Sequence, residues 1–551
     1  MKKILTTTLF AIFCLSVNAQ TPSWAWAVSA GGSNNDLAQC VTTDGVGNVY
    51  TCGNFFSPTI TFGSFTLTRS GNSSGFIVKQ NNTGNVIWAK CINNTGISFP
   101  SCNGICVDKN GFIFVAGSFN DSITFNTTGL ATYGTDVFLV KFDSSGSVIW
   151  AKNSNSKGIR AEVSTAVCTD KLDNIYLLGE FWTDSLTFGS TTLICPQGHR
   201  YNFIVKYNSS GNALWAKSIT GDFMQDPYDI SADSIGNVYI IGNYRSLTLT
   251  FDSIVLTNSV SDSSTNDIFI ARYDVSGNAV WAKSFGGVGQ DLGKSIDVDM
   301  DGNIHVTGRF AGPTITFDTT TLTGIYTTAN TYILKFDNNF NIAWGKSFGH
   351  HGSKITTDDS GNTYVAGEFG GSISIDNYSF SSAGEYDIYV AKFDVQGNTV
   401  SAVCAGGVLY EFIKGMSIGN QGACYITGYF SSPACTFGTY TLTNNTTSTA
   451  NMINDIYIAK LDFQTGTNVL NHQEISLSVY PNPFSNTINI NQTEYSNNSE
   501  ICIFDLLGKQ VYNSQISSKN TINTSEFKKG VYILKLIDVR GNTLVKKLVK
   551  N

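Results

Sequence analysis

The sequence predicts an all-β protein: a seven-bladed β-propeller of four-stranded blades, closed by an N-terminal strand and followed by a small C-terminal antiparallel β-sandwich. Three observations lead to this prediction. A sequence repeat returns every 57 to 66 residues along most of the 551-residue chain. Each repeat contains four short segments of the β type, and the two ends of the repeat region complement each other. Self-similarity at a regular period is the signature of a repeat architecture, so it is interpreted before any single motif.

Three signatures, each present seven times, define the repeat. The first is a tryptophan in a W-A-K-like stretch, and its seventh copy, at residues 401–407, lacks the tryptophan. The second follows G-N-x-Y-x-x-G with variations, and the third is an alternating apolar run that ends in a cation. The tryptophans are Trp26, Trp88, Trp150, Trp215, Trp281 and Trp344; the final glycines are Gly53, Gly117, Gly179, Gly242, Gly308, Gly367 and Gly428; the cations are Lys79, Lys141, Lys206, Arg272, Lys335, Lys392 and Lys460.

Each repeat contains four predicted strands, which we name A to D. In one region of the chain they cover residues 295–299, 303–308, 267–273 and 279–284, the last two taken from the preceding copy. Apolar and polar residues alternate along each segment, as in a half-buried strand. Asp, Gly and Asn join A to B and C to D, which predicts tight hairpin turns. The B–C and D–A connections are longer and differ between copies.

The ends of the repeat region predict a closed ring. Residues 24–28 form a strand D with no strands A to C before it, whereas the last copy has strands A to C and no strand D after residue 461. If the N-terminal strand completes the last sheet, the ring has only short, protected edges. The alternative is an open β-solenoid, which does not require complementary ends.

The signatures resemble those of the bacterial β-propeller repeat family typified by G-N-x-Y-V-x-G and W-A-K. The resemblance extends over the predicted propeller, residues 20–462. It implies the propeller architecture and implies no particular activity.

Residues 1–19 are predicted to be a secretory signal peptide. Lys2 and Lys3 precede an apolar run, and Asn18 and Ala19 form a small-residue cleavage site. The alternative is an N-terminal membrane anchor, but the run is shorter than the roughly 20 apolar residues that span a bilayer. No other segment is a candidate transmembrane span. The mature protein is therefore expected outside the cytoplasm.

Composition agrees with export and argues against nucleic-acid binding. Charged residues make up 14% of the chain and the formal net charge is −7, so the chain lacks a basic footprint. Removal of Cys14 with the signal peptide leaves eleven cysteines. We interpret most of them as small buried apolar residues. A local disulfide between Cys91 and Cys102 stays open as an alternative.

The C-terminal region has a different character from the repeats. A polar linker is predicted at residues 463–475, and residues 476–551 contain alternating segments at 478–484, 501–512, 529–536 and 541–550. Strands separated by turn residues predict a small antiparallel sandwich. These motifs resemble the type A sorting domain of the type IX secretion system of Bacteroidetes. The resemblance implies the secretion machinery as a partner, proteolytic removal of the domain, and release or attachment to surface lipopolysaccharide.

Two groups of acidic residues are candidates for chemistry. Asp297, Asp299 and Asp301 match the beginning of a D-x-D-x-D-G calcium loop, although the twelfth position is Gly308 in place of glutamate. Asp299 also aligns with the turn aspartates of other repeats, so a hairpin turn is the alternative, and calcium is the one candidate cofactor. The second group lies ten or eleven residues past the anchors of three repeats. Because its members recur, we interpret them as a structural ladder; they are Asp36, Asp226 and Asp291.

The sequence favours a non-enzymatic binding or adhesion module at the cell surface or in the extracellular space. It lacks a once-only acid pair, a nucleophile set or a metal cluster, so we do not expect an enzyme. The alternatives are a secreted polysaccharide hydrolase or lyase, and a structural surface spacer. The ligand is expected to be an extracellular glycan or protein.

The variable connections predict which face binds the ligand. Antiparallel strands place the A–B and C–D turns on one face and the B–C and D–A loops on the other. The turns are short and uniform, whereas the loops vary, and recognition is usually carried by variable loops on a rigid scaffold. We therefore predict ligand contacts on the loop face near the centre of the ring. The candidates are Asp222, Phe223, Tyr228, Tyr410 and Phe412.

Overall fold

The computed structural model describes residues 22–551 except for 95–99, 126–127, 157–159, 197, 262, 326–328, 420–421, 447–451, 464–476, 493–499, 506–508, 516–519 and 538–542. The predicted signal peptide and nearly all of the predicted linker lie outside the described residues. The chain divides into two compact units, Met1–Thr465 and Gly466–Asn551, and each is treated by itself. The secondary structure of the described residues consists of β-strands, without an α-helix, which confirms the predicted all-β class.

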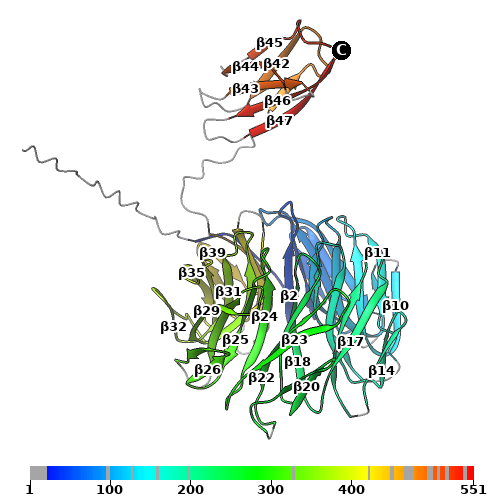
Figure 1. Cartoon of the computed structure of the whole chain (residues 1–551), viewed down its shortest axis with the longest axis vertical. Helices are drawn as coiled ribbons and strands as arrows, with labels where there is room; N and C mark the ends of the chain where they lie inside the picture. The colour runs from blue at the N-terminus through cyan, green and yellow to red at the C-terminus, as the bar shows by residue number, and fades with distance from the viewer. Residues whose placement is uncertain are drawn as a thin grey trace, which may run out of the picture. The chain divides into compact units, whose positions relative to one another are not determined.

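In its described part, the first unit contains seven antiparallel groups of four strands. Figure 1 shows strands of these groups side by side. Within each group the strands pair in the order A, B, C, D. The groups are β2 (Asp36–Thr43), β3 (Val49–Phe55), β6 (Ser74–Gln80), β7 (Val86–Asn94); β8 (Ser101–Val107), β9 (Ile113–Phe125), β10 (Thr128–Phe142), β11 (Val148–Asn153); β12 (Glu162–Thr169), β13 (Ile175–Phe181), β16 (Tyr201–Tyr207), β17 (Ala213–Gly221); β18 (Gln225–Ala232), β19 (Val238–Tyr244), β22 (Asp267–Tyr273), β23 (Ala279–Phe285); β24 (Leu292–Val298), β25 (Ile304–Phe310), β28 (Asn330–Phe336), β29 (Ile342–Gly349); β30 (His351–Thr357), β31 (Thr363–Phe369), β34 (Asp387–Phe393), β35 (Thr399–Gly407); and β36 (Glu411–Ile418), β37 (Ala423–Phe430), β40 (Asp455–Asp462), β1 (Ser23–Ala30).

The B–C connections contain short hairpins on the outside of the groups. In the second group the hairpin is continuous with β9 and β10. The separate hairpins are β4 (Thr59–Phe62) with β5 (Phe65–Thr68), β14 (Ser185–Phe188) with β15 (Thr191–Ile194), β20 (Thr248–Phe251) with β21 (Ile254–Thr257), β26 (Thr314–Phe317) with β27 (Thr320–Thr323), β32 (Ser372–Ile375) with β33 (Tyr378–Ser381), and β38 (Ala434–Phe437) with β39 (Tyr440–Thr443).

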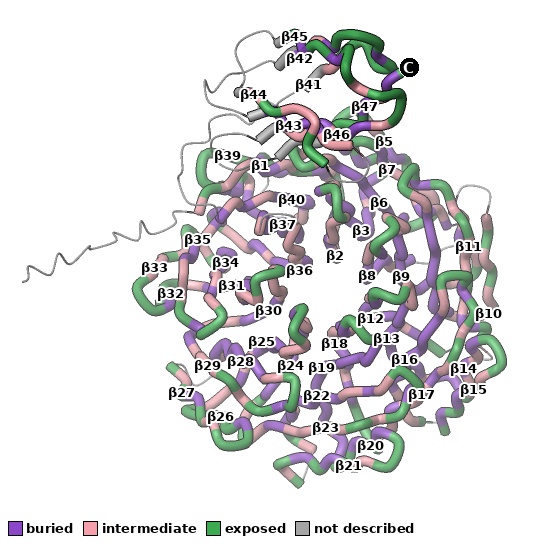
Figure 2. The backbone as a smooth tube through the Cα atoms, turned by 45° about the horizontal axis from the view of Figure 1, so that its top comes forward, coloured by how far each residue is buried: buried purple, intermediate pink, exposed green. Residues whose placement is uncertain are grey.

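The seven A strands line the centre of the unit (Figure 2). Each contacts the A strands of the two neighbouring groups, and β36 contacts β2 in the same way. The strand at the N-terminal end, β1, pairs with β40 of the last group, with Trp26 opposite Lys460 and Ala30 opposite Ile456. The predicted β-propeller class is confirmed, and this strand arrangement is that of a ring.

The tryptophan signature has a structural role between neighbouring blades. The indole Nε1 of Trp215 donates a hydrogen bond of 3.2 Å to the Val275 carbonyl, in the C–D turn of the next blade. Lys206 donates to the same carbonyl at 3.2 Å. Equivalent bonds join Trp26 to Asn82, Trp88 and Lys79 to Ser144, Trp150 and Lys141 to Ser209, and Trp344 to Val395. The two most regular side chains of the repeat therefore fasten one blade to the next.

The turn signature is explained by hydrogen bonds of its aspartate. Asp44 accepts bonds from the backbone N–H groups of Val46 and Asn48, from the Asn48 amide and from the Tyr50 hydroxyl. The same set forms around Asp170, Asp233 and Asp358. Asp, Asn and Tyr of the sequence signatures thus form one local unit that stabilises these four A–B turns.

The second unit contains two antiparallel sheets. The first pairs β41 (Leu477–Tyr480), β42 (Thr487–Gln492) and β45 (Asn520–Asn523); the second pairs β44 (Gln510–Gln515), β43 (Glu500–Asp505), β46 (Gly530–Ile537) and β47 (Thr543–Lys550). Phe484 and Ile488 share one buried core with Ile503, Leu534 and Leu548. A core of this kind between two sheets is that of the predicted small β-sandwich.

The described cysteines carry free thiols, and these include Cys91 and Cys102. The disulfide that the sequence left open is therefore absent from the structure. Cys102 is fully buried, and burial raises the pKa of its thiol. The interpretation of this residue as a small apolar core side chain agrees with that environment.

Candidate functional site

The centre of the propeller is lined by residues at β-bulges. Every A strand has one residue that the pairing with strand B skips, for example Tyr228 between Pro227 and Asp229. A bulged residue lacks a partner in the ladder, so its side chain can be re-aimed away from the sheet. The seven bulge residues are Gln39, Asn103, Thr165, Tyr228, Lys294, Ser353 and Lys414. We call them the bulge ring.

All seven members of the bulge ring line one central cavity of about 480 Å³. They occupy the first half of their strands, on the side where the A strands begin, which places the cavity toward the D–A and B–C loops. Glu180, Arg200 and Asp226 also line it, as do Lys354 and Glu368. The cavity is therefore polar and charged, and every blade contributes to it.

On one side of the cavity, the charged side chains form ion pairs with one another. Arg200 forms ion pairs with both Glu180 and Asp226, the latter at 2.7 Å. Its guanidinium also stacks 4.6 Å from the Trp182 ring. Burial raises the pKa of Glu180, and the charge of Arg200 opposes this shift. An arginine held by two carboxylates and a ring is strongly positioned.

The other side carries lysines without such partners. Among the described residues, no hydrogen bond or ion pair is formed by the ammonium groups of Lys294, Lys354 or Lys414. Lys294 Nζ lies 3.6 Å above the centre of the Tyr228 ring, and Lys414 Nζ lies 5.4 Å from that of Tyr429. Glu368 is occupied by Ser353 Oγ at 2.6 Å and by the Ile413 N–H at 3.1 Å. With three lysines against the single carboxyl group of Glu368, this side of the cavity has an excess of positive charge.

A row of aromatic rings runs along the loop side of the last two blades. Each ring centre lies close to the next one in the row. The distances are 6.0 Å between His351 and Tyr386, 5.9 Å between Tyr386 and Tyr410, 6.2 Å between Tyr410 and Phe412, and 5.3 Å between Phe412 and Tyr429. The Tyr410 and Phe412 planes differ by only 3°. All five side chains are half-buried, so each ring keeps an accessible surface. We call this set the aromatic row, and Lys414 lies at its Phe412–Tyr429 end, 5.9 Å from Phe412 and 5.4 Å from Tyr429.

The structure places the five predicted ligand contacts in three locations. Tyr228 lies in the bulge ring, and Tyr410 and Phe412 lie in the aromatic row. Asp222 and Phe223 lie in the D–A loop before β18 and do not line the central cavity. Asp222 accepts a bond from the Leu247 N–H at 2.9 Å, and the Phe223 N–H donates to Ser246. The Phe223 side chain is 50% exposed.

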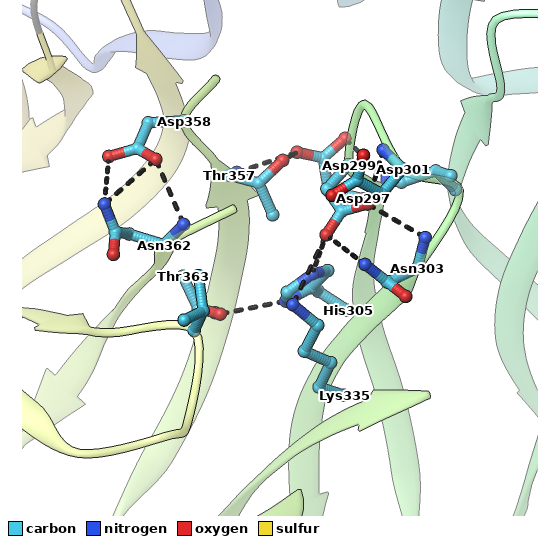
Figure 3. A network of polar contacts seen from close by, with 12 residues as sticks. Asp297, Asp299, Asp301, Asn303, His305, Lys335, Thr357, Asp358, Asn362 and Thr363 are labelled. Atoms are coloured by element: carbon cyan, nitrogen blue, oxygen red, sulfur yellow. Dashed lines mark hydrogen bonds and ion pairs between the residues drawn. The ribbon is translucent and has the colours of Figure 1, made fainter. Parts of the chain in front are cut away.

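The predicted calcium residues are engaged by the protein (Figure 3). Asp299 accepts bonds from the backbone N–H groups of Asp301 and Asn303, from the Asn303 amide and from His305. Although burial acts to raise it, the bonds from His305 and Asn303 hold the pKa of Asp299 well below its usual range. Lys335 lies 3.4 Å from the same carboxylate. Asp299 is thus the turn aspartate of its blade, with His305 in place of the usual tyrosine.

Asp297 belongs to a different contact, in the interface with the next blade. It accepts bonds from the Thr357 N–H at 2.8 Å and the Thr357 hydroxyl at 2.9 Å (Figure 3). Asp301 is exposed at the turn. The part of the chain that the structure describes contains no group of three His, Cys, Asp or Glu side chains that could hold a metal ion. The turn alternative accounts for Asp299, and Asp297 and Asp299 bond different partners.

The acid ladder divides into two kinds of residue. Asp36 and Asp291 occupy the third position before the bulge, where Asp36 accepts bonds from the Phe56 and Ser57 N–H groups and Asp291 from that of Ala311. Asp226 lies one residue later in its strand and lines the cavity. The first two are structural, as predicted for the ladder, whereas Asp226 belongs to the site.

Sequence reasoning missed most of the bulge ring, although a signal is present. Each bulge residue lies five positions before the turn aspartate of its repeat, or before Gly419 in the last one. The residue type at this position differs from repeat to repeat, whereas the neighbouring residues alternate regularly between apolar and polar. Because a bulge depends on the pairing of two strands, the single-strand pattern does not reveal that the position faces the axis.

Comparisons with known proteins support the sorting domain and provide little on the propeller. Residues 478–551 match the family model of the secretion system C-terminal sorting domain. The chain is 26% identical over 355 residues to an uncharacterized WD repeat-containing protein of Acanthamoeba polyphaga mimivirus, covering 53% of this chain and 25% of that protein. It is 29% identical over 106 residues to the regulatory protein FlaEY of Caulobacter vibrioides, covering 19% and 11%. The chain thus spans a quarter or less of the length of these relatives.

Solved structures resemble the chain only distantly. Sqt1 from Chaetomium thermophilum has a TM-score of 0.37 at 10% identity, covering 74% of this chain and 83% of that one. BamB from Moraxella catarrhalis has a TM-score of 0.25 at 7% identity, covering 63% and 96%. The fold therefore rests on the strand pairing described above.

The sorting domain determines the destination of the protein. Within the described residues, no helix has the length and apolar character that crossing a bilayer requires. The sandwich of the second unit coincides with the residues matched by the sorting-domain model. The chain is a β-propeller protein with a C-terminal sorting domain, exported by the type IX secretion system to the cell surface or the extracellular space.

Proposed function

We propose that the propeller is a non-enzymatic binding module that recognises an extracellular glycan through the aromatic row. The observation that carries this proposal is the spacing of five rings over the last two blades, next to a polar cavity. Ligand sites combine aromatic surface with a few convergent polar groups. Flat, partly exposed rings can present apolar surface to the C–H groups of sugars, and the neighbouring cavity offers hydrogen-bonding groups.

The row is also rigidly supported. Tyr386 and Tyr410 belong to an isolated parallel bridge, and the Glu411 N–H donates to the Tyr386 carbonyl at 2.8 Å. Phe412 and Tyr429 are on paired positions of β36 and β37. Rings held on paired backbone lose little conformational freedom when a ligand binds, which favours affinity.

The test uses the secreted protein and a glycan-binding screen, followed by calorimetry with the best glycan. Tyr410→Ala and Phe412→Ala are each expected to weaken binding roughly tenfold, since an aromatic contact contributes about 0.5–1.5 kcal/mol beyond its buried area. Ser234→Ala and Ile235→Ala, on an A–B turn of the opposite face, are the matched controls. If the turn variants weaken binding and the aromatic variants do not, the face is wrongly assigned.

A secreted hydrolase or lyase is the second candidate, and one observation favours it. Burial raises the pKa of both Glu180 and Glu368, which line the cavity, and a carboxyl group with a raised pKa can act as a general acid. The same glycan panel distinguishes the two functions. Release of reducing ends or unsaturated sugars, lost in Glu368→Gln, would establish an enzyme. A protein that binds none of the glycans and cleaves none would instead fit a surface spacer.

A further inference from the structure

We propose that the Lys294 side of the bulge ring is an anion-binding subsite, which selects acidic polysaccharides carrying carboxylate or sulfate groups. This inference rests on the proposed glycan-binding function and specifies the charge of the glycan. The subsite consists of Lys294, Lys354 and Lys414, from the A strands of three consecutive blades. Arg309, on the neighbouring strand β25, is close enough for its charge to act on Lys294.

The first argument is the distribution of charge around the cavity. Of the acids that line it, Glu180 and Asp226 share Arg200, and Glu368, which is bonded by Ser353 and Ile413, is the one carboxyl group that also acts on Lys414. Three lysines and Arg309 outnumber this single carboxyl group. The three lysines and Arg309 form no ion pair among the described residues. Like charges held together in a partly buried place disfavour one another's charged forms, and an anion that joins them offsets this cost. The arrangement is thus completed by a ligand of negative charge.

The second argument is how the lysines are held. The Lys294 ammonium is placed above the Tyr228 ring, and that of Lys414 lies 5.9 Å from the centre of the Phe412 ring and 5.4 Å from that of Tyr429. Cation–π contacts orient an ammonium group without neutralising it. Both ammonium groups therefore keep the ability to donate charge-assisted hydrogen bonds to a ligand.

The third argument is continuity with the aromatic row. Phe412 and Tyr429 belong to the row and also contact Lys414. A sugar chain lying along the row would meet Lys414, which also lines the cavity, at the Phe412–Tyr429 end. An acidic substituent at that end of the chain would meet the lysines, whereas a neutral chain would leave them unpaired.

The titration of Lys294 agrees with this arrangement. Burial, with the charges of Arg309, Lys414 and Lys354, lowers the pKa of Lys294 to about 7, and the charge of Asp226 opposes the shift. Burial and the nearby charges of Arg309, His350 and Lys294 lower the pKa of His351 to about 4, so this ring is neutral near pH 7. Burial raises the pKa of Tyr228 to about 12, so its hydroxyl is also neutral. An anion in the cavity would favour the protonated lysine.

The test is titration of the secreted protein with polygalacturonate, chondroitin sulfate, neutral dextran and polyglutamate. Lys294→Gln and Lys414→Gln are each expected to weaken binding of the acidic polysaccharides roughly 10- to 100-fold, the range for a charge-assisted hydrogen bond. Lys294→Arg should restore most of the affinity. Lys109→Gln, at an exposed turn on the opposite face, is the matched control and should change nothing. Melting temperatures check that each variant folds.

The arms separate this inference from the function on which it rests. Preference for polygalacturonate or for the sulfated chain identifies the anion. If dextran binds as tightly as the acidic chains and Lys294→Gln changes neither, the anion subsite is refuted while glycan binding stands. If polyglutamate binds as tightly as polygalacturonate, the assignment to polysaccharide is refuted. If no arm binds, both proposals fail.

The same subsite predicts a pH dependence. Binding of an acidic polysaccharide should weaken as pH rises from about 6 to about 9, because free Lys294 loses its proton near pH 7. Calorimetry in two buffers of different ionisation enthalpy should show proton uptake on binding near pH 7.5. Lys294→Arg should remove both effects, since arginine stays charged. Proton release, or an affinity that rises with pH, would contradict the assignment.

Discussion

Deletion of residues 476–551 is expected to abolish delivery of the propeller to the cell surface or medium and to leave it in the periplasm. The match at residues 478–551 assigns this segment to sorting, and the segment forms a compact unit with its own core. Because the propeller has a separate core, the truncated protein should still fold. The measurement is immunoblotting of periplasmic, surface and medium fractions with an antibody against the propeller.

Two controls sharpen this prediction. A periplasmic reporter fused to residues 476–551 should be exported, which tests whether the segment is sufficient. A substitution in the sandwich core, Leu534→Ala, should reduce export in the full chain, because loss of a fully buried leucine costs about 2–5 kcal/mol in a small domain. Normal surface delivery of the truncated protein would show that residues 476–551 are not the sorting signal.

Deletion of residues 22–30 is expected to be the most damaging change within the propeller. It removes β1, so that β40 becomes an unpaired edge strand next to β37. It also removes the buried Trp26 ring and its bond to the Asn82 carbonyl in the first blade. Loss of a buried tryptophan alone costs about 3–5 kcal/mol, and an exposed strand edge promotes aggregation. We expect a melting temperature at least about 10 °C lower, and aggregation on concentration.

A peptide with the sequence of residues 22–30, added in trans, should recover part of the lost stability. Trp26→Ala, which keeps the backbone of β1, should have a smaller effect than the deletion. The measurements are differential scanning calorimetry and size-exclusion chromatography with light scattering. A deletion variant that stays monomeric with unchanged melting would mean that β1 does not close the ring.

The local parts of the fold could be predicted because their causes lie close together in sequence. Apolar and polar residues alternate within single strands, and each turn aspartate bonds N–H groups two and four residues later. Trp215 and Lys206 are recognisable as repeated residues, although their shared acceptor, the Val275 carbonyl, lies about one repeat away. The repeat thus indicated which side chains matter, while the contact itself required the neighbouring blade.

The candidate site was predicted less completely, and particular residues show why. Tyr410 and Phe412 could be proposed as exposed aromatic residues in a variable loop, but their partners Tyr386 and Tyr429 come from another connection and another strand. Asp297 and Asp299 are two residues apart in the sequence, which suggested a shared metal. In the structure Asp299 bonds its own turn and Asp297 bonds Thr357 of the next blade.

The sequence by itself determined the architecture of this protein and its destination. The repeat period, the alternation of apolar and polar residues, the turn residues and the C-terminal motifs can each be recognised from residues that are close together in the sequence. The tertiary structure decided what faces the axis. Lys294 lines the cavity because its strand bulges against β25. Lys414 lines the same cavity because blades that are far apart in the sequence surround one centre. Bulges and ring geometry arise from pairing between strands. A charge cluster built from residues about 60 positions apart is therefore invisible until the blades are assembled.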